Sequence, residues 1–445
     1  MNSDRNQAGP VRELAPDYVT LYESPDPQRI FGYSPGIARL DGGRLVATTG
    51  GRLIATIDVG GPGAAELQGV KYHNTRRDSH WQGRVYTSDD GGQTWAHRAD
   101  FPFMHARPFV AGDAVYVLGQ AGDLTVMSSR DGGATWGDPV KLTDGQAWHQ
   151  APCNVLHANG CVYLVMERRT SFDITSWPVG EMAPVLMRGR VESDLTVAAN
   201  WTFASELSFR DVLPSVETGP AIDFFGVPFF ESPYPKGSDV APRRNCAPIG
   251  WLETNVVQFT DPDHLWYDPT GRTFHLWMRA HTGGTGYACI AKVVEQGEEA
   301  GSGAMTTMLE TAPSGKTMLY VPCPGGQMKF HVLYDEATRL YWLLSTQATD
   351  SMTKPDRLPD NRYNLPNNER RRLQLHFSKN MVDWCFAGLV AVGPVEHASR
   401  HYASMEIDAD DLVILSRSGD ERAKSPHDGN LVTVHRVTDF RELVY

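Results

Sequence analysis

The chain has 445 residues, of which 41% are hydrophobic and 21% charged, and its formal net charge is −12, a composition typical of globular proteins. The acidic balance and the lack of a basic stripe argue against a nucleic-acid partner, and no apolar run is long enough to span a membrane. The 42 glycines, 29 prolines and 11 tryptophans indicate many tight turns and half-buried sheet faces.

The N-terminal residues Met1–Arg5 are polar and lack the apolar segment of a signal peptide. We therefore expect a soluble, cytoplasmic protein, although a secreted or periplasmic chain whose signal peptide had been removed would have the same sequence. The six cysteines show no C-x-x-C pair and no zinc-ligand spacing. Buried free thiols are expected, with a disulfide between Cys153 and Cys161 as the alternative. No metal or other cofactor is predicted.

Strand patterns run along the chain in repeated pairs. A first strand at Tyr18–Glu23 precedes six units, each of which has an opening apolar strand, a Gly/Asp turn and a second apolar strand. The opening strands are expected at Ser34–Leu40, Ala106–Ala111, Ala151–Ala158, Leu252–Phe259, Lys329–Tyr334 and Tyr402–Ile407. We expect the initial strand to pair as the outer strand of the last unit and so to close a ring, because closure removes exposed sheet edges.

An eight-residue segment occurs twice in the chain. Ser88–Trp95, with the sequence SDDGGQTW, recurs as SRDGGATW at Ser129–Trp136, an offset of 41 residues that matches the length of one propeller blade. The acidic residue bonds to its own turn, the paired glycines permit positive φ, and the tryptophan covers the turn. We expect Trp95 and Trp136 to stabilise hairpin turns away from any functional site.

The whole chain is expected to form one domain, from residue 1 to residue 445, with long inserted loops near 206–250 and 349–370. Loops of that length commonly form lids or substrate walls. The basic run at Arg370–Arg372 lies at the end of the second loop, and we interpret it as solvated.

The repeated segments resemble the Asp-boxes, or BNR repeats, of the sialidase superfamily, and the chain resembles that superfamily over most of its length. The segments Gly250–Glu253 and His427–Asn430 are most similar to those of uncharacterised bacterial sialidase-like proteins. The resemblance implies an all-β fold, a six-bladed β-propeller in which each blade has four antiparallel strands.

In a propeller the starts of the inner strands and the ends of the second strands meet at the axis. An acidic chain places four basic side chains there, which predicts a site for a carboxylate or sulfate because guanidinium groups pair with planar anions. The expected ligand-binding residues are Arg168, Arg279, Lys329, Arg417, His401, Gln150 and Asp428. Ion pairing with strand neighbours is the alternative role for Arg279 and Arg417.

Three residues at the same positions are candidates for catalysis. Glu253 stands at the start of an otherwise apolar strand, where a carboxylate is unfavourable unless it is paired or used in chemistry. His149 lies beside Trp148, and a purely structural hydrogen bond at a blade junction is its alternative role. With Tyr402, these residues form the predicted catalytic group, in which we expect Glu253 to be ionised and to act as a base or as the partner of the tyrosine.

Sialidases bind the sugar carboxylate with three arginines and attack with a tyrosine that a glutamate activates. The resemblance assigns two of the arginine positions to Arg279 and Arg417, and the tyrosine–glutamate pair to Tyr402 and Glu253. The chain departs from the family where sialidases have a Phe-Arg-Ile-Pro motif, because residues 32–37 read GYSPGI and lack the first arginine.

Three functions remain open from the sequence. The first is an exo-glycosidase that releases a terminal acidic sugar, with Glu253 and Asp428 as a carboxyl pair or Tyr402 as nucleophile. The second is a polysaccharide lyase, in which His149 or Tyr402 removes the proton next to a uronate carboxylate. The third is a glycan-binding propeller without catalysis. All three imply a glycan partner, and the sequence indicates no oligomeric state.

Overall fold

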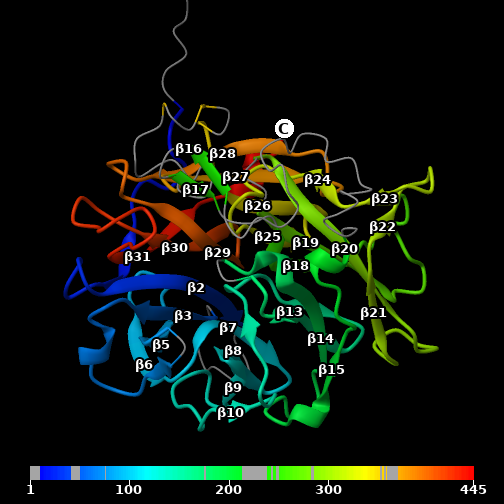
Figure 1. Ribbon diagram of the computed structural model, residues 1–445, viewed down its shortest axis with the longest axis horizontal. Coiled ribbons are helices and arrows are strands. Elements are labelled where there is room, and N and C mark those ends of the chain that lie inside the picture. The colour runs from blue at the N-terminus through cyan, green and yellow to red at the C-terminus, as the bar shows by residue number, and fades with distance from the viewer. Residues whose placement is uncertain are drawn as a thin grey trace, which may run out of the picture.

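The computed structural model describes residues 11–41, 51–75, 77–174, 177–212, 238–241, 244–246, 250–281, 285–350, 353–354, 357 and 369–445. Six antiparallel sheets surround one axis like the blades of a propeller (Figure 1). The expected six-bladed, all-β fold is therefore confirmed. The predicted loops near 206–250 and 349–370 lie largely outside the described residues. None of the described helices is long and apolar enough to cross a membrane.

Each blade is a meander that starts at the axis. Blade 1 contains β2 (Phe31–Leu40), β3 (Arg52–Gly60), β4 (Tyr72–Asn74), β5 (Ser79–Ser88) and β6 (Ala96–Phe101). Blade 2 contains β7 (Met104–Ala111), β8 (Ala114–Ala121), β9 (Asp123–Ser129) and β10 (Val140–Lys141). Blade 3 contains β11 (Trp148–His149), β12 (Leu156–Ala158), β13 (Cys161–Arg169), β14 (Met182–Arg190) and β15 (Trp201–Phe203).

The second half of the chain repeats the pattern. Blade 4 contains β18 (Gly250–Val257), β19 (Thr273–His281), β20 (Tyr287–Glu295), β21 (Met305–Met308) and β24 (Tyr320–Pro322). Blade 5 contains β25 (His331–Asp335), β26 (Leu340–Gln347), β27 (Arg372–Ser378) and β28 (Cys385–Val392). Blade 6 contains β29 (Arg400–Asp408), β30 (Asp411–Ser418), β31 (Leu431–Val437) and β1 (Val19–Glu23). Short elements in the connections are α1 (Phe209–Val212), β16 (Ser238–Ala241), β17 (Arg244–Cys246), β22 (Glu310–Thr311) and β23 (Thr317–Met318).

The N-terminal strand closes the ring. β1 pairs antiparallel with β31, with Val19 opposite Val434 and Glu23 opposite Leu431, so residues from the two ends of the chain complete blade 6. This confirms the closure expected for Tyr18–Glu23. A closed ring of blades leaves no long sheet edge open to another chain.

The hydrophobic core is divided among the contacts between neighbouring blades. Six clusters of buried apolar side chains occur, and each lies between the sheets of two adjacent blades. The largest fully buried side chains include Trp251, Trp277 and Trp342 on the strands of blades 4 and 5. Because both faces of an inner strand are covered, these strands are apolar on both faces instead of alternating.

The repeated eight-residue segments form identical turns. In the first, the Ser88 hydroxyl accepts a hydrogen bond from the N–H of Gly92 (2.8 Å), and the indole of Trp95 donates to the carbonyl of Gly92 (3.0 Å). The second copy, residues 129–136, has the same two bonds at 2.8 and 3.1 Å. Gly92 has φ of 89°, a conformation that favours glycine. Both tryptophans thus pack on turns of the outer strands, as predicted.

The inner strand of blade 3 differs from the expectation. We predicted one strand over Ala151–Ala158, whereas β11 ends at His149 and β12 begins at Leu156. Between them, the side-chain amide of Asn154 bonds to both the N–H and the carbonyl of Val256, each at 2.8 Å. Pro152 cannot donate a backbone hydrogen bond, and a side chain replaces strand pairing in this segment.

The cysteines whose side chains are described, Cys153, Cys161, Cys289, Cys323 and Cys385, are free thiols. The alternative of a disulfide between Cys153 and Cys161 is therefore wrong. Both of these thiols are buried, in agreement with the first interpretation. Cys246 lies outside the residues whose side chains are described.

Candidate active site

Four inner strands carry a β-bulge at the same level of the axis. The register shifts in β2, β7, β18 and β29, and at each shift one non-glycine residue has a positive φ. These residues are Ser34 (37°), His105 (54°), Glu253 (58°) and Tyr402 (49°). Such a conformation is strained and persists only where the surrounding structure imposes it, and bulges redirect side chains beside functional sites. The bulges therefore mark one end of the axis, which we call the Tyr402 mouth.

Arg279 connects the two predicted catalytic residues. Its Nη1 donates hydrogen bonds to the Tyr402 hydroxyl (2.8 Å) and to Oε2 of Glu253 (3.2 Å), and its Nε donates to the carbonyl of Gln327 (2.7 Å). Glu253 is 1% and Arg279 3% exposed. Burial raises the pKa of Tyr402, Arg279 opposes this effect, and Glu253 adds to it. Residues of blades 4 and 6 thus form one hydrogen-bonded group.

Two further arginines surround the Tyr402 ring. The guanidinium carbon of Arg417 lies 4.1 Å from the centre of the Tyr33 ring and 5.3 Å from that of Tyr402. The guanidinium carbon of Arg370 lies 5.6 Å from the Tyr402 ring, and its Nη1 bonds to Nδ1 of His401 (3.1 Å). Burial lowers the pKa of Arg370 to about 9 and also lowers the pKa of Arg417. Neither forms an ion pair with a carboxylate among the described residues.

The wall beside Arg417 is formed by residues of blades 1 and 6. The Tyr33 hydroxyl donates to Oδ1 of Asp428 (2.9 Å), and Nδ1 of His427 lies 2.8 Å from the same oxygen. Although burial acts against it, the hydrogen bonds from His427 and Tyr33 lower the pKa of Asp428. Asp428 is therefore ionised near neutral pH and orients the Tyr33 side chain under Arg417.

Aromatic side chains form the opposite part of the rim. The ring of His149 packs edge-on against His105 (5.0 Å between centres) and Trp177 (5.3 Å). Trp81 lies 5.0 Å from Tyr33. Burial lowers the pKa of His149 to about 4, against the opposing effect of Glu253. His149 is therefore a neutral imidazole near pH 7.

The charges of this mouth are unbalanced. Among the described residues, the three guanidinium groups of Arg279, Arg370 and Arg417 face two carboxyl groups, those of Glu253 and Asp428. Asp58 is the third acidic residue, and burial raises its pKa well above the usual value while its two oxygens accept the N–H of His105. A buried cation is costly without a counter-ion, so the arrangement favours an anionic ligand.

Three of the predicted ligand-binding residues do not join this group. The Lys329 ammonium, on a residue that is 1% exposed, donates to the Ala403 carbonyl and the Ser404 hydroxyl. The Gln150 amide donates to backbone carbonyls of blades 3 and 4. Arg168 pairs with Glu206, with both side chains 36% exposed. Each of these side chains thus bonds to partners outside the group around Tyr402, and its role in ligand binding stays a prediction.

Sequence reasoning missed two residues of the mouth. Arg370 was interpreted as solvated, which is wrong, because it is 6% exposed. Arg370 precedes β27, the third strand of blade 5. Because neighbouring strands are antiparallel, β27 starts at the same end of the blade at which the second strand, β26, finishes. Asp58 lies near the end of β3, opposite Tyr33. Including the starts of third strands as well as first strands would have identified Arg370.

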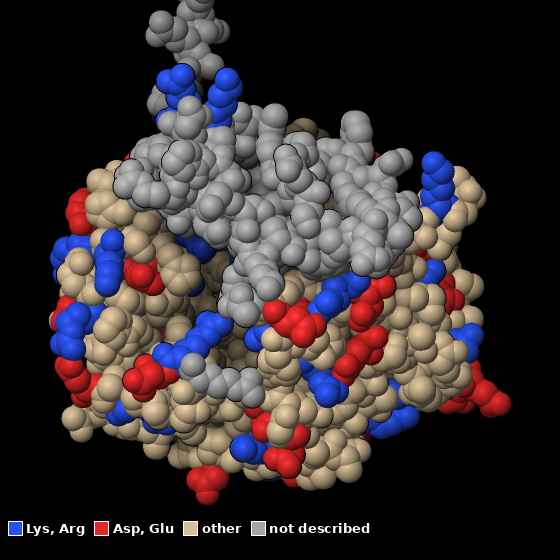
Figure 2. All heavy atoms as spheres, in the orientation of Figure 1, with Lys and Arg blue, Asp and Glu red and all other residues tan. Residues whose placement is uncertain are grey.

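The face of the propeller seen in Figure 2 is hollowed near its centre, where the axis lies, and basic and acidic side chains are interspersed around it. In the part of the chain that the structure describes, no group of three or more His, Cys, Asp or Glu side chains is arranged to hold a metal ion.

No protein-family model matches the chain, and no curated protein matches it significantly in sequence. Among solved structures, a protein of unknown function from Dyadobacter fermentans is 11% identical, with 96% of this chain and 99% of that chain covered and a TM-score of 0.51. An α-L-arabinanase from Penicillium chrysogenum, solved with arabinobiose, is 11% identical, covers 97% and 99%, and has a TM-score of 0.48. The Trypanosoma rangeli sialidase, solved with sialic acid, is 13% identical, covers 96% and 59%, and has a TM-score of 0.49.

These likenesses concern the fold. Six blades of four or five strands, with ring closure by the N-terminal strand, give this chain the architecture of a six-bladed β-propeller.

Proposed function

We propose that the chain is a glycoside hydrolase that removes a terminal, carboxylate-bearing sugar from a glycan at the Tyr402 mouth. One observation carries the proposal: a single guanidinium group, that of Arg279, bonds to both Tyr402 and Glu253, with Arg370 and Arg417 beside the same tyrosine. The three arginines bind the sugar carboxylate, whose negative charge compensates the excess of guanidinium groups among the described residues of the mouth.

In the proposed reaction the Tyr402 oxygen attacks the anomeric carbon while Glu253 accepts its proton. The bond to the leaving oxygen breaks, and water later cleaves the glycosyl–tyrosine bond with Glu253 returning the proton. A tyrosine is used in place of a carboxylate because its neutral form reaches an anionic sugar without like-charge repulsion.

The leaving oxygen needs a proton, and we assign this role to Asp58, whose carboxylate then takes a proton from the attacking water in the second step. Burial raises the pKa of Asp58 well above its usual value, which favours the protonated form that a general acid requires. Asp428 is unsuited to donate a proton, because the hydrogen bonds that it accepts from His427 and Tyr33 lower its pKa.

The test is a digestion of sialate- and uronate-terminated oligosaccharides, with the same glycans ending in neutral sugars as controls, followed by mass spectrometry. The expected result is a gain of one water for acidic ends and slow or absent turnover for neutral ends. Equal turnover of neutral ends would refute the arginine-bound carboxylate.

The same assay separates the other functions. Cleavage without added water, with absorbance from a new double bond, would make the chain a lyase in which the neutral His149 takes the proton. Binding without cleavage of any glycan would leave a binding propeller. Placement in the cytoplasm stays a prediction that cell fractionation would test.

A further inference from the structure

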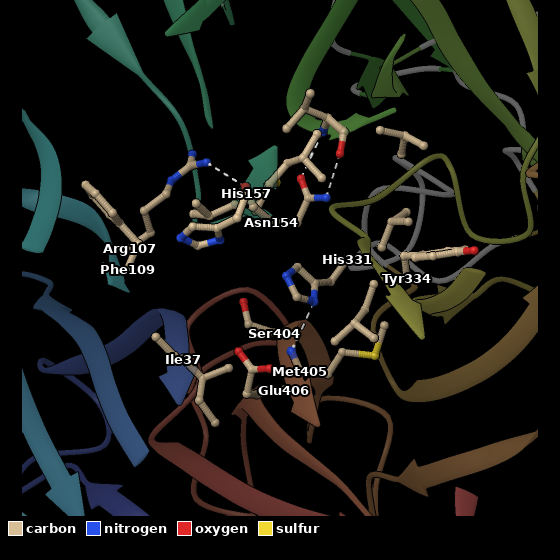
Figure 3. A pocket seen from close by; sticks show the side chains of 18 of the residues that line it. Ile37, Arg107, Phe109, Asn154, His157, His331, Tyr334, Ser404, Met405 and Glu406 are labelled. Carbon is tan, nitrogen blue, oxygen red and sulfur yellow. Dashed lines mark hydrogen bonds between the residues drawn. The ribbon is translucent and has the colours of Figure 1, made fainter. Parts of the chain in front are cut away.

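A second cavity, of about 360 Å³, lies at the other end of the axis (Figure 3). Its walls come from the later residues of the same inner strands, among them Ile37 of β2, Val256 of β18, Leu333 of β25 and Glu406 of β29. The residues of the Tyr402 mouth lie at the beginning of these strands. We call this space the Glu406 cavity.

A layer of buried polar contacts separates the two ends of the axis. The Ser404 hydroxyl donates to the carbonyl of Pro35 (2.8 Å) and accepts from the Lys329 ammonium (3.0 Å), so it links blades 1, 5 and 6. Ser404 is 2% and Lys329 1% exposed. A ligand in the Glu406 cavity is therefore outside the Tyr402 mouth, and this inference goes beyond the proposed function.

His331 supplies a hydrogen-bond donor to the cavity. Its Nδ1 accepts the backbone N–H of Met405 (3.1 Å), which places the ring proton on Nε2 in the neutral imidazole. Burial lowers the pKa of His331 well below its usual value, so the neutral form prevails. The side chain is 7% exposed and lines the cavity, and its Nε2–H has no partner among the described residues.

Glu406 supplies the acceptor. Its Oε1 accepts the backbone N–H of Ile407 (3.0 Å), and the carboxyl group forms no ion pair within the described residues. Burial raises its pKa to about 7, and an ammonium group beside it would favour the ionised form. Arg39 is the cation on the neighbouring strand, but its guanidinium already pairs with Asp41 (3.0 Å) and Asp408 (3.3 Å). In Figure 3 the side chains of His331 and Glu406 both border the open space.

The other basic residue of the lining does not compete for Glu406. Arg107 is 1% exposed, and its guanidinium donates to the backbone carbonyls of Asn154 (3.3 Å) and Val165 (2.9 Å). Glu336, at the exposed rim, adds a second acidic group. Ile37, Val256 and Leu333 add apolar surface to the walls, beside the donor of His331 and the acidic acceptor of Glu406.

We propose that the Glu406 cavity is a second ligand site, which takes a small organic amine with an apolar body and one hydrogen-bond acceptor. The ammonium group pairs with Glu406, the acceptor faces Nε2–H of His331, and the apolar body fills the space between Ile37 and Leu333. The cavity volume falls in the range of small-molecule sites, about 300–1,000 Å³.

The test uses three probes of similar shape on the full chain, with Kd measured by calorimetry. Tyramine carries both the ammonium and a phenolic acceptor, 2-phenylethylamine lacks the acceptor, and 3-(4-hydroxyphenyl)propionate replaces the ammonium with a carboxylate. Tyramine should bind one molecule per chain, 2-phenylethylamine should bind several-fold more weakly, and the propionate should not bind.

Matched variants locate the site. Glu406→Gln should weaken tyramine binding about tenfold or more, because a charge-assisted pair is lost, whereas Glu336→Gln, the same change at the rim, should leave Kd within about twofold. Ile37→Trp, which fills the cavity without changing charge, should abolish binding, and Tyr402→Phe should leave it unchanged.

The inference is wrong if the propionate binds as well as tyramine, or if tyramine binding survives both Glu406→Gln and Ile37→Trp in chains that melt at the wild-type temperature. Loss of binding in Tyr402→Phe would also overturn it, by placing the amine in the other mouth. None of these results depends on glycan turnover, so the proposed function is tested separately.

Discussion

The two ends of the axis are built from the same inner strands but differ in strand pairing and in the side chains that line them. At the Tyr402 mouth β2, β7, β18 and β29 are bulged, four residues have positive φ, and three buried arginines gather. At the Glu406 cavity β2, β18 and β29 pair in regular register, and apolar and polar side chains share the walls. The difference shows that chemistry is concentrated where the strand ladder is irregular, because a bulge redirects a side chain that regular pairing would keep between the blades.

The two ends also have opposite electrostatic character. Among the described residues, the Tyr402 mouth has more guanidinium groups than carboxyl groups, whereas Glu406 forms no ion pair and the basic residues beside it are bonded elsewhere. One end thus favours an anion and the other a cation, and the buried contacts of Ser404 lie between them.

The largest effect is expected from Tyr402→Phe. Removing the oxygen that we propose as the nucleophile should lower kcat by about 10³-fold or more, while the circular dichroism of the folded chain and tyramine binding at the other end stay unchanged. Tyr33→Phe is the matched control, since it removes a hydroxyl from the same mouth that bonds to Asp428 and not to Arg279. Equal losses for both tyrosines would show that the tyrosines support the mouth and that the nucleophile is another group.

Arg370→Met should raise KM for an acidic substrate about 10- to 100-fold, with a smaller change in kcat, because hydrogen bonds to a charged group are lost. Neutral substrates should be unaffected. Arg168→Met is the control at an exposed ion pair, and KM should stay within about twofold. If the two variants have the same KM, the anion does not bind beside Tyr402.

Glu167 lies near the end of β13 and bonds to Thr254, the residue after Glu253 in the bulge. Its substitution therefore tests how the bulge is stabilised. It is fully buried, and its Oε1 accepts the N–H and hydroxyl of Thr254 at 3.0 and 2.8 Å. Burial raises its pKa to about 8, so between about pH 5 and 8 the folded chain binds a proton that the unfolded chain has lost. The contribution of this group to stability therefore falls as pH rises through that window.

Glu167→Gln should remove that part of the pH dependence, a difference on the order of 3 kcal/mol in the free energy of unfolding between pH 5 and 8. Urea unfolding at several pH values measures it, with Glu336→Gln as the control at an exposed carboxylate. Parallel pH curves for wild type and Glu167→Gln would show that the carboxyl group is ionised in the folded chain.

The smallest effect is expected far from both ends. Trp95→Phe removes the bond to the Gly92 carbonyl and should cost about 1 kcal/mol of stability, with glycan turnover and amine binding unchanged. Trp136→Phe should behave in the same way because its turn has the same bonds. A loss of turnover in either variant would connect the outer turns to the Tyr402 mouth and weaken the contrast between periphery and axis.

The sequence by itself determined the fold. The repeated turn segments, the strand pairs and the spare N-terminal strand are local patterns, and each is decided by residues close together in the chain: paired glycines that permit positive φ, a tryptophan that covers its own turn, and apolar runs that must be covered on both faces. The same patterns placed Glu253, Arg279, Tyr402 and Arg417 at one end of the axis.

The tertiary structure alone decided which polar side chains face that end. Lys329, Gln150 and Arg168 have suitable positions in the chain, but the first two bond to groups of neighbouring strands and Arg168 pairs with Glu206 in a connection. Arg370 lies in a charged run that is indistinguishable from a solvated one until blade 5 places it beside Tyr402 and buries it. Sequence patterns indicate where a strand lies and which of its residues are apolar. The partner of a polar side chain depends on residues from other blades. The free energy of burying a charge is therefore determined only when those blades pack together.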